Sequence, residues 1–108
     1  MWSVLFHPEA EAELDRVVAK ERAAILNAVE KLKALGPQLP FPHQSHLEGT
    51  GRLRELRPRA GRSPWRGLYG QRGEVFVIAA IGPEAEVDPR GFGRAVAAAT
   101  DRLLEIQT

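Results

Sequence analysis

The sequence contains no cysteine, which excludes a disulfide framework, a thiolate metal site and a cysteine nucleophile. It also lacks any run approaching the roughly 18 consecutive apolar residues that a membrane-spanning helix needs. The first residues show neither the basic region nor the small-residue cleavage site of a signal peptide. Together these absences predict a soluble, cytoplasmic protein that does not bind a membrane.

The composition is otherwise ordinary for a globular protein. Of the 108 residues, 44% are hydrophobic and 27% are charged, which excludes disordered, collagen-like and low-complexity classes. Most domains contain about 50 to 250 residues. We therefore expect a single domain over residues 1–108.

Charge is balanced overall but uneven along the chain. The net charge is +1, from 15 basic and 14 acidic residues. Residues 9–15 include four acids and no base, whereas residues 52–72 include seven arginines and a single acid, Glu55. The arginines are Arg52, Arg54, Arg57, Arg59, Arg62, Arg66 and Arg72. One concentrated arginine surface on a nearly neutral protein favours a local anionic partner.

The N-terminal part predicts one strand and two helices. Residues 2–6 are rich in aromatic and β-branched types, which is typical of a strand. A helix over about residues 8–20 is followed by a second helix that ends at Gly36 and Pro37. We expect a break between residues 20 and 23 and an antiparallel helical hairpin. No glycine or proline separates the two helices, so one bent helix is the alternative.

The C-terminal part predicts three strands and a final helix. Residues 36–51, rich in proline and glycine, predict a long surface loop. Strands are expected over residues 53–57, 65–70 and 74–81, and the last is apolar enough to be a central strand covered on both faces. Asp88 is the expected N-cap of an amphipathic helix that runs to about the C-terminus. The predicted order is β-α-α-β-β-β-α, an α+β fold with helices packed on a mainly antiparallel sheet.

The arginine-rich strands place charged groups on one face. Because side chains alternate along a strand, Glu55 and Arg57 share a face, and Arg66 on the next strand would lie beside them. Two adjacent strands would then form a positively charged pocket into which both guanidinium groups point. Arginine suits phosphate because its planar fork donates two parallel hydrogen bonds and stays charged, and Trp65 and Tyr69 could stack on unpaired bases. The alternative is that these arginines are solvated strand-edge residues or meet an acidic partner segment.

Several short motifs occur in a fixed order along nearly the whole chain. The main ones are Leu-Arg-Glu-Leu-Arg-Pro at residues 53–58, Trp-Arg-Gly-Leu-Tyr at residues 65–69 and the apolar strand from Val75. Three shorter ones are His7-Pro8, Leu35-Gly36-Pro37 and Leu47-Glu48-Gly49. In this order the motifs resemble the RelE/HigB toxin superfamily, most closely its phage-derived HigB-like branch. The resemblance implies a small RelE-like fold.

The resemblance also implies an activity. It is that of a type II toxin that enters the ribosomal A site, cleaves mRNA without a metal or other cofactor and so inhibits translation. A cognate antitoxin would neutralise it, in this branch usually a helix-turn-helix protein of the HigA type. By position, Arg57 would hold the phosphate, Arg66 would stabilise the transition state and Glu55 would stand at the place of a general base in some relatives. The residues expected to bind RNA are Arg52, Arg54, Arg59, Trp65 and Tyr69.

One segment departs from the family pattern. Relatives commonly carry a basic run after the last strand, whereas residues 81–87 here contain Glu84 and Glu86 and no base. Carboxylates in this segment would repel a phosphate rather than stabilise it. The role of general base would then pass to Glu84, to Glu86 or to a loop histidine, His43 or His46. Otherwise RNA cleavage is weak or lost. The three histidines lack metal-ligand spacing, so no metal site is expected.

Two other functions stay open at this point. A catalytically weak or inactive module of the same fold would bind an antitoxin-like partner or RNA without cleaving it. The gyrase-inhibiting branch of the fold is a further alternative, although no residue of this sequence favours it.

Overall fold

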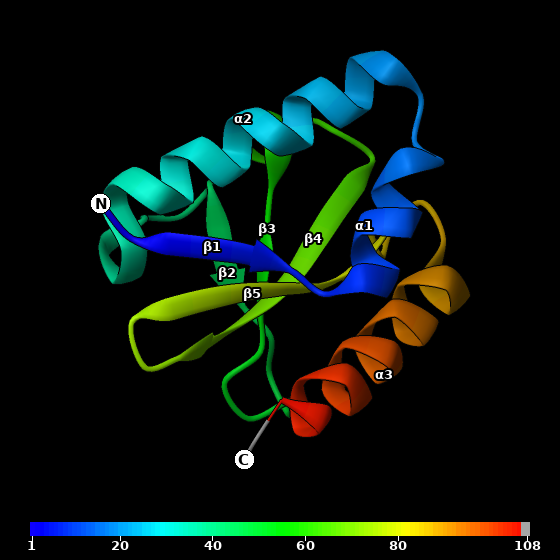
Figure 1. Cartoon of the computed structure of the whole chain (residues 1–108). Coiled ribbons are helices and arrows are strands. Elements are labelled where there is room, and N and C mark those ends of the chain that lie inside the picture. The colour runs from blue at the N-terminus through cyan, green and yellow to red at the C-terminus, as the bar shows by residue number, and fades with distance from the viewer. Residues whose placement is uncertain (107–108) are drawn as a thin grey trace.

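The computed structural model describes residues 1–106 and contains a five-stranded sheet with helices on both faces (Figure 1). In chain order the helices and strands are β1 (Ser3–Phe6), α1 (Pro8–Asp15), α2 (Ala19–Leu35), β2 (Gln44–His46), β3 (Arg54–Leu56), β4 (Trp65–Arg72), β5 (Val75–Pro83) and α3 (Pro89–Glu105). Two short 3-10 turns lie between them, η1 (Gly36–Gln38) and η2 (Pro58–Gly61).

The sheet is mixed but mainly antiparallel. Its strand order is β1-β5-β4-β3-β2, and the β1–β5 pair alone is parallel among the four pairs of the described chain. The predicted α+β class, with helices on a mainly antiparallel sheet, is confirmed.

Strand β5 is the buried centre of the sheet. Phe76 and Ile78 belong to the core between the sheet and α2, whereas Val77 and Ala80 belong to the core between the sheet and α3. Neither face of β5 is in contact with water, and the side chains on both faces are accordingly apolar. This explains the continuous apolar run that predicted a strand covered on both faces.

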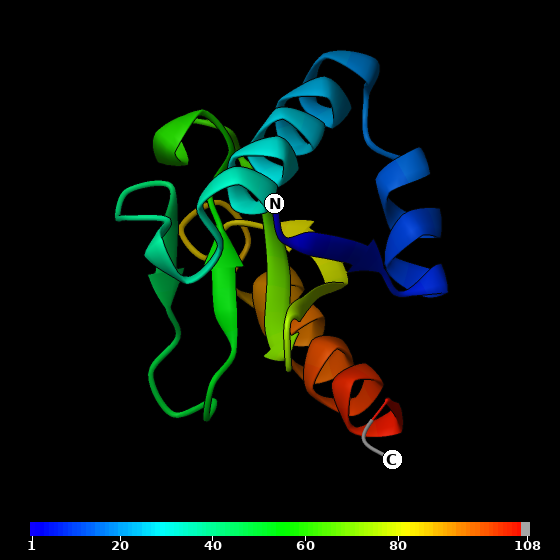
Figure 2. The ribbon, with the colours of Figure 1, turned by 60° about the vertical axis from the view of Figure 1, so that its left-hand side comes forward.

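The two N-terminal helices are separate, but their break lies earlier than predicted. α1 ends at Asp15 and α2 begins at Ala19, ahead of the expected break at residues 20–23. Arg22 stabilises the junction by donating to the main-chain carbonyls of Asp15 and Val17, at 3.3 and 3.1 Å. The predicted antiparallel hairpin is wrong, because α1 packs on β1 and β5 while α2 crosses the sheet (Figure 1 and Figure 2). Each helix buries its apolar side on the sheet.

Two helix ends follow the signals in the sequence. α2 ends at Gly36, whose φ of 54° is in the left-handed region that glycine adopts at little cost. The indole of Trp2 packs where a side chain on residue 36 would lie. α3 begins directly after its N-cap Asp88, whose carboxylate accepts a hydrogen bond from the Gly91 amide at 2.9 Å. Within residues 1–106, no helix combines the length and apolar character needed to cross a bilayer.

The region expected to be a loop over residues 36–51 contains an additional strand. β2 forms the edge of the sheet and pairs antiparallel with β3, so that Ser45 lies opposite Glu55. Its sequence, Gln-Ser-His, has no apolar alternation, because an edge strand this short is held by main-chain hydrogen bonds rather than by buried side chains. β2 brings the loop histidines beside the arginine-rich strand β3.

Candidate nucleic-acid interface

The three residues predicted to carry the chemistry lie together where β3 ends and β4 begins. Arg57 Nη1 donates to Glu55 Oε1 at 2.8 Å, and Arg66 Nε lies 3.5 Å from the same oxygen. Glu84, which follows β5, accepts from Arg66 Nη2 at 2.7 Å. Two arginines and two glutamates therefore alternate as Arg57–Glu55–Arg66–Glu84, which we call the ion-pair network.

Arg66 is the buried centre of the ion-pair network, with 5% of its side chain exposed. Its Nη1 donates to the main-chain carbonyls of Ser63 and Trp65, at 2.7 and 2.9 Å, and its Nη2 donates to that of Gly61 at 3.3 Å. Every nitrogen of the guanidinium group thus faces a protein oxygen. The structure does not give Arg66 the exposed position that the predicted transition-state contact requires. Arg66 instead fixes the corner between η2 and β4.

The two carboxylates of the network are likewise committed to arginine. Glu55 is 7% exposed and meets an arginine on each side, so the place implied for a general base holds an ion-pair partner. Glu84 carries the charge that compensates Arg66. Of the two acids after β5, Glu84 is therefore neutralised locally, and an acid–base role for Glu84 finds no support in its contacts.

Arg57 differs from Arg66 because part of its guanidinium group stays available. Its Nε donates to the Pro42 carbonyl at 3.0 Å, and its guanidinium lies 5.4 Å from the centre of the Phe41 ring. Nη2 makes no hydrogen bond to any residue of the described chain, 1–106. It lies against Gly61, where a side chain would collide with it. Arg57 is thus held in place with one nitrogen free to donate to an anion.

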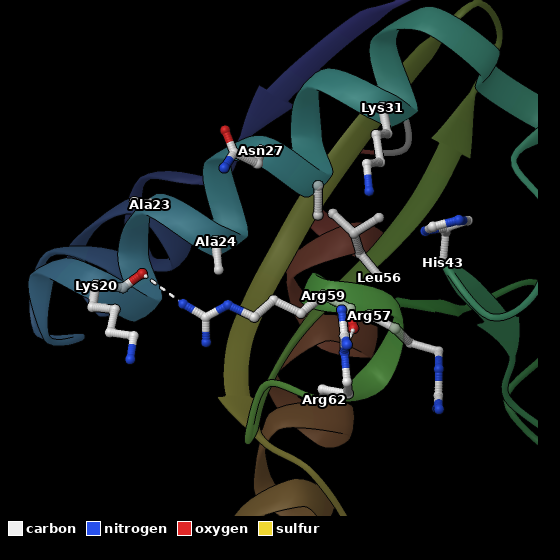
Figure 3. Close-up of a pocket in the computed structure, with 11 residues that line it drawn as sticks. Lys20, Ala23, Ala24, Asn27, Lys31, His43, Leu56, Arg57, Arg59 and Arg62 are labelled. Carbon is white, nitrogen blue, oxygen red and sulfur yellow. Dashed lines mark hydrogen bonds between the residues drawn. The ribbon is translucent and has the colours of Figure 1, made fainter.

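Arg57 lines a groove between helix α2 and the segment formed by β3 and η2 (Figure 3). The groove has a volume of about 520 Å³. Its lining residues are Lys20, Ala23, Ala24, Asn27, Ala28, Lys31, His43, Leu56, Arg57, Arg59 and Arg62. Five of these carry a positive charge and none is a carboxylate, so we call this space the basic groove. Such a surface attracts polyanions.

The two lysines of the basic groove were missed at the sequence level. Lys20 and Lys31 lie on α2 and line the groove together with Arg59 of η2 and Arg62, which follows η2 (Figure 3). A signal was present, because Lys20, Ala24, Asn27 and Lys31 follow one another at intervals of four, three and four residues and so share a helix face. This stripe lies beside the buried apolar stripe of α2, and the sequence pattern alone does not distinguish the two.

The turn η2 holds an unusual backbone at the edge of the groove. Arg59 and Ala60 have φ values of 55° and 57°, which residues other than glycine rarely adopt. Arg59 Nη1 donates to Glu21 of α2 at 2.7 Å, and the Ser63 hydroxyl donates to the same carboxylate at 2.8 Å. These hydrogen bonds, first that from Arg59, hold the pKa of Glu21 below its usual value. Arg59 therefore lines the groove with its charge partly balanced.

A second space, which we call the distal pocket, lies where α2 no longer covers the sheet. It has a volume of about 500 Å³ and lies between η1 and strands β2 to β5. Its lining residues are Gly36, Pro37, Leu39, Gln44, His46, Arg52, Arg54, Tyr69, Gln71, Gly73 and Phe76. Four residues predicted for RNA binding or acid–base work thus meet in one place: Arg52, Arg54, Tyr69 and His46. They are not beside Arg57.

The two residues predicted to stack on bases, Trp65 and Tyr69, lie in different hollows and outside the basic groove. Tyr69 is 2% exposed and packs edge-on against Phe76, with ring centroids 5.9 Å apart. Trp65 is half-buried against the core and lines a hollow with Pro83 and Arg94, outside the basic groove and the distal pocket. Burial therefore leaves the Tyr69 ring no free face for the predicted stacking, whereas the stacking of Trp65 stays a prediction.

The loop histidines divide between the two spaces. His43 lines the basic groove beside Arg57, whereas His46 lines the distal pocket with its Nε2 2.8 Å from the Gly51 carbonyl oxygen. Of these two, His43 is the one placed to exchange a proton with a group bound next to Arg57.

Comparison with known proteins identifies a family. A family model described as "Phage derived protein Gp49-like" matches residues 12–81. Among curated protein sequences, none matches this chain.

Two solved structures share the fold. One is a mutant of the E. coli toxin RelE in the free state, with 16% identity, a TM-score of 0.64 and coverage of 89% of this chain and 95% of that chain. The other is the archaeal RelE–RelB complex from Pyrococcus horikoshii, with 25% identity, a TM-score of 0.55 and coverage of 76% and 93%.

Proposed function

Because this chain belongs to the phage-derived Gp49-like family within the RelE-like toxin superfamily, we propose that it is the toxin of a type II toxin–antitoxin pair. In this proposal it acts in the cytoplasm, where it cleaves mRNA on the ribosome and inhibits translation. The predicted RelE/HigB-like resemblance is thus confirmed at the level of the superfamily, and the cleavage reaction is the part proposed here.

The observation that carries the proposal is Arg57 on the wall of the basic groove. Its Nη2 has no partner within residues 1–106, while contacts with Pro42, Glu55 and Phe41 hold the rest of the group in place. A donor that is already oriented stabilises charge on a phosphate without reorganisation at the moment of reaction. The four other cations of the groove suit the flanking phosphates of a single strand.

The chemistry proposed is attack of an RNA 2′-hydroxyl on its adjacent phosphate. The new bond joins phosphorus to O2′, the bond to O5′ breaks, and the products are a 2′,3′-cyclic phosphate and a free 5′-hydroxyl. Arg57 would hold the phosphate oxygens, and His43 would take the proton of the 2′-hydroxyl or supply one to O5′. Glu55 and Arg66 would act as positioning residues that fix Arg57. No step uses a metal ion.

A second candidate function is a RelE-fold module that binds RNA or an antitoxin-like partner without cleaving RNA. It is favoured by the ion-pair network, because Glu84 occupies the guanidinium of Arg66 at 2.7 Å. A protein in which that arginine is never released would retain the basic groove and lose a transition-state contact. The two candidates differ only in whether RNA is cut.

The proposed partner is a cognate antitoxin. RelE is bound to RelB in the archaeal structure that shares the fold. For the present chain we propose a helix-turn-helix antitoxin of the HigA type, as the phage-derived branch implies, with acidic segments that complement the arginine-rich surface.

Induced expression in bacteria that lack the antitoxin tests the toxin function. We expect wild type and Arg90→Ala, which removes an exposed arginine on α3, to stop growth and to leave mRNA cut inside the reading frame. The variants Arg57→Lys, His43→Ala and the double variant Lys20→Ala/Lys31→Ala should restore growth. Coexpression of the antitoxin should restore growth in every case.

Cleavage is then measured in a purified translation system with ribosomes stalled on a defined mRNA. Cut mRNA with 2′,3′-cyclic phosphate ends supports the endonuclease. Growth arrest with intact mRNA would instead establish the non-cleaving module, and normal growth of the wild-type strain with intact mRNA would overturn the toxin function itself.

A further inference from the structure

The turn that precedes β2 carries a large aromatic side chain on its outside. Phe41 is 69% exposed and belongs to neither of the two apolar cores. A single exposed apolar residue is common on protein surfaces and does not by itself indicate a binding site. The surroundings of this ring are more specific, because the turn is attached to Arg57.

Two hydrogen bonds attach the turn over residues 40–43 to Arg57. The Arg57 amide donates to the His43 carbonyl at 2.9 Å, and the Arg57 Nε donates to the Pro42 carbonyl at 3.0 Å. The His43 amide closes the turn by donating to the Pro40 carbonyl at 2.9 Å. The main chain therefore fixes the position of Phe41 relative to Arg57.

The guanidinium group of Arg57 and the ring of Phe41 are direct neighbours. The central carbon of the guanidinium group lies 5.4 Å from the centre of the ring, within the roughly 6 Å over which a cation and an aromatic face attract each other. Because 69% of the Phe41 side chain is exposed, the side of the ring away from Arg57 is open to solvent. An oriented hydrogen-bond donor, Nη2 of Arg57, thus lies close to an aromatic surface that no core residue covers.

A nucleotide carries the two groups that complement this pair. Its phosphate accepts hydrogen bonds from a guanidinium group, and its base offers a flat face to an aromatic ring. His43, from the same turn, lines the basic groove together with Arg57 (Figure 3). A strand whose phosphates lie in the groove therefore brings a base to the ring beside Arg57. The carboxylate of an acidic protein segment would meet the cations equally well but has no flat ring to lay on Phe41.

From these contacts we propose that Phe41 stacks on the base of the nucleotide whose phosphate Arg57 holds. The inference rests on the proposed function, because it assumes an RNA ligand. Every base has a π face, so this contact adds affinity without selecting one base over another. Phe41 anchors the strand next to the reacting phosphate, while the cations of the groove hold the phosphates that flank it.

Fluorescence anisotropy with two labelled strands of equal length tests the stacking contact. One strand is oligouridylate, and the other has the same sugar–phosphate backbone without bases. Phe41→Leu keeps an apolar side chain but removes the π face, and it should weaken binding of oligouridylate about tenfold, as the loss of one base–aromatic stack predicts. Binding of the abasic strand should not change. Phe41→Tyr, which retains the ring, should bind both strands as wild type does.

Two control variants separate stacking from other effects. Leu5→Ala removes an exposed apolar side chain from β1, at the opposite edge of the sheet, and should change binding of neither strand. Lys31→Ala removes a groove cation and should weaken binding of both strands by the same factor. Thermal melting checks that each variant is folded.

The other outcomes would overturn the inference in different ways. If Phe41→Leu bound oligouridylate as tightly as wild type while Lys31→Ala weakened binding, the ring would not stack, and the groove would remain the RNA site. Equal losses of both strands in Phe41→Leu would mean that the ring only positions Arg57. Unchanged RNA binding, together with growth arrest that the cognate antitoxin no longer relieves, would assign the ring to a protein partner. If wild type bound neither strand and cut no mRNA on the ribosome, the proposed function would fall and the inference with it.

Discussion

Arg66 combines a full charge with almost complete burial, and its neighbours are arranged to compensate that charge. Removing one partner of a buried ion pair is far more costly than the net stability of the pair, because an uncompensated charge stays behind. Arg66→Ala would leave Glu84 without its cation and would free three main-chain carbonyls from their donor.

We therefore expect Arg66→Ala to lower the free energy of unfolding by about 3 to 5 kcal/mol in urea titrations. Arg62→Ala, which removes an exposed arginine from the same segment, should change it by less than about 0.5 kcal/mol. Equal stability of the two variants would contradict the structural role of Arg66. The comparison matters for function, because a loss of toxicity in Arg66→Ala would reflect unfolding rather than a missing catalytic group.

Tyr69 offers a direct spectroscopic check of the distal pocket, because it is the sole tyrosine of the sequence. Burial raises the pKa of Tyr69 from 10.0 to about 12, and the nearby charge of Arg54 opposes this rise. Phenolate absorbance should therefore show one titration with a midpoint near 12 in the native protein, and near 10 in urea-unfolded protein. A native midpoint near 10 would contradict the burial of this side chain.

The same shift makes stability depend on pH in the alkaline range. The folded state holds the proton of Tyr69 more tightly than the unfolded state does. The resulting contribution to the free energy of unfolding is fully present below pH 10 and is lost as the pH rises toward 12. The expected slope over this interval is about 1.4 kcal/mol per pH unit. Tyr69→Phe should remove this slope in urea titrations while it leaves stability near neutral pH unchanged.

At the scale of elements, the start of α3 depends on one capping contact. Asp88 accepts from the Gly91 amide at 2.9 Å, and the glycines of the first turn give the helix little intrinsic support. Asp88→Ala should lower the free energy of unfolding by about 1 kcal/mol. Asp101→Ala, an exposed change within the same helix, is the control and should change it by less than about 0.5 kcal/mol. Equal values for the two variants in urea would argue against the cap.

The contact between α2 and η2 is the second element-level feature with a measurable consequence. Hydrogen bonds from Arg59 and Ser63 lower the pKa of Glu21, so the unfolded state binds more protons as the solution is acidified. The stabilisation that this contact supplies is present above about 4.5, the pKa of Glu21 in the unfolded chain. It is lost as the pH falls through the lower pKa that Glu21 has in the folded protein.

Glu21→Gln should therefore be less stable than wild type at neutral pH and should lose less stability on acidification. Urea midpoints measured at about pH 7 and about pH 3 test this, with Glu30→Gln on the exposed side of α2 as control. If Glu21→Gln and wild type lost the same amount of stability between the two pH values, the contact would not form in solution.

At the scale of the whole molecule, charge is segregated although the net charge is only +1. Five cations gather in the basic groove, whereas the acids at the start of the chain lie on α1, where Glu9 and Glu13 pair with Arg102 of α3. This separation allows a nearly neutral protein to present one local field to a polyanion.

The proposed RNA binding should therefore fall steeply with salt. For single strands, each phosphate contact contributes about 0.7 to the slope of log K against log salt concentration. The double variant Lys20→Ala/Lys31→Ala should reduce the slope by about 1.4, and Arg90→Ala should not change it. Binding titrations at several salt concentrations measure this. An unchanged slope in the double variant would place the RNA elsewhere on the surface.

The sequence by itself determined the order of the helices and of the strands other than β2, the stop at Gly36, the cap at Asp88 and the identity of β5 as a central strand. Each of these depends on interactions within a few residues, so a local pattern contains the information. β2 escaped prediction because a polar edge strand of three residues is defined by its pairing with β3, which local sequence does not encode.

Only the tertiary structure decided which arginines are free. The sequence placed Arg57 and Arg66 near Glu55, and they do meet, but the carboxylate that occupies Arg66 comes from residue 84 and the carboxylate that balances Arg59 comes from residue 21 of α2. The groove itself is closed by lysines from α2 rather than by a second strand. Whether a charge faces solvent, a ligand or an ion partner depends on groups distant in the chain, because electrostatic pairing is set by distances in space that only the packed fold defines.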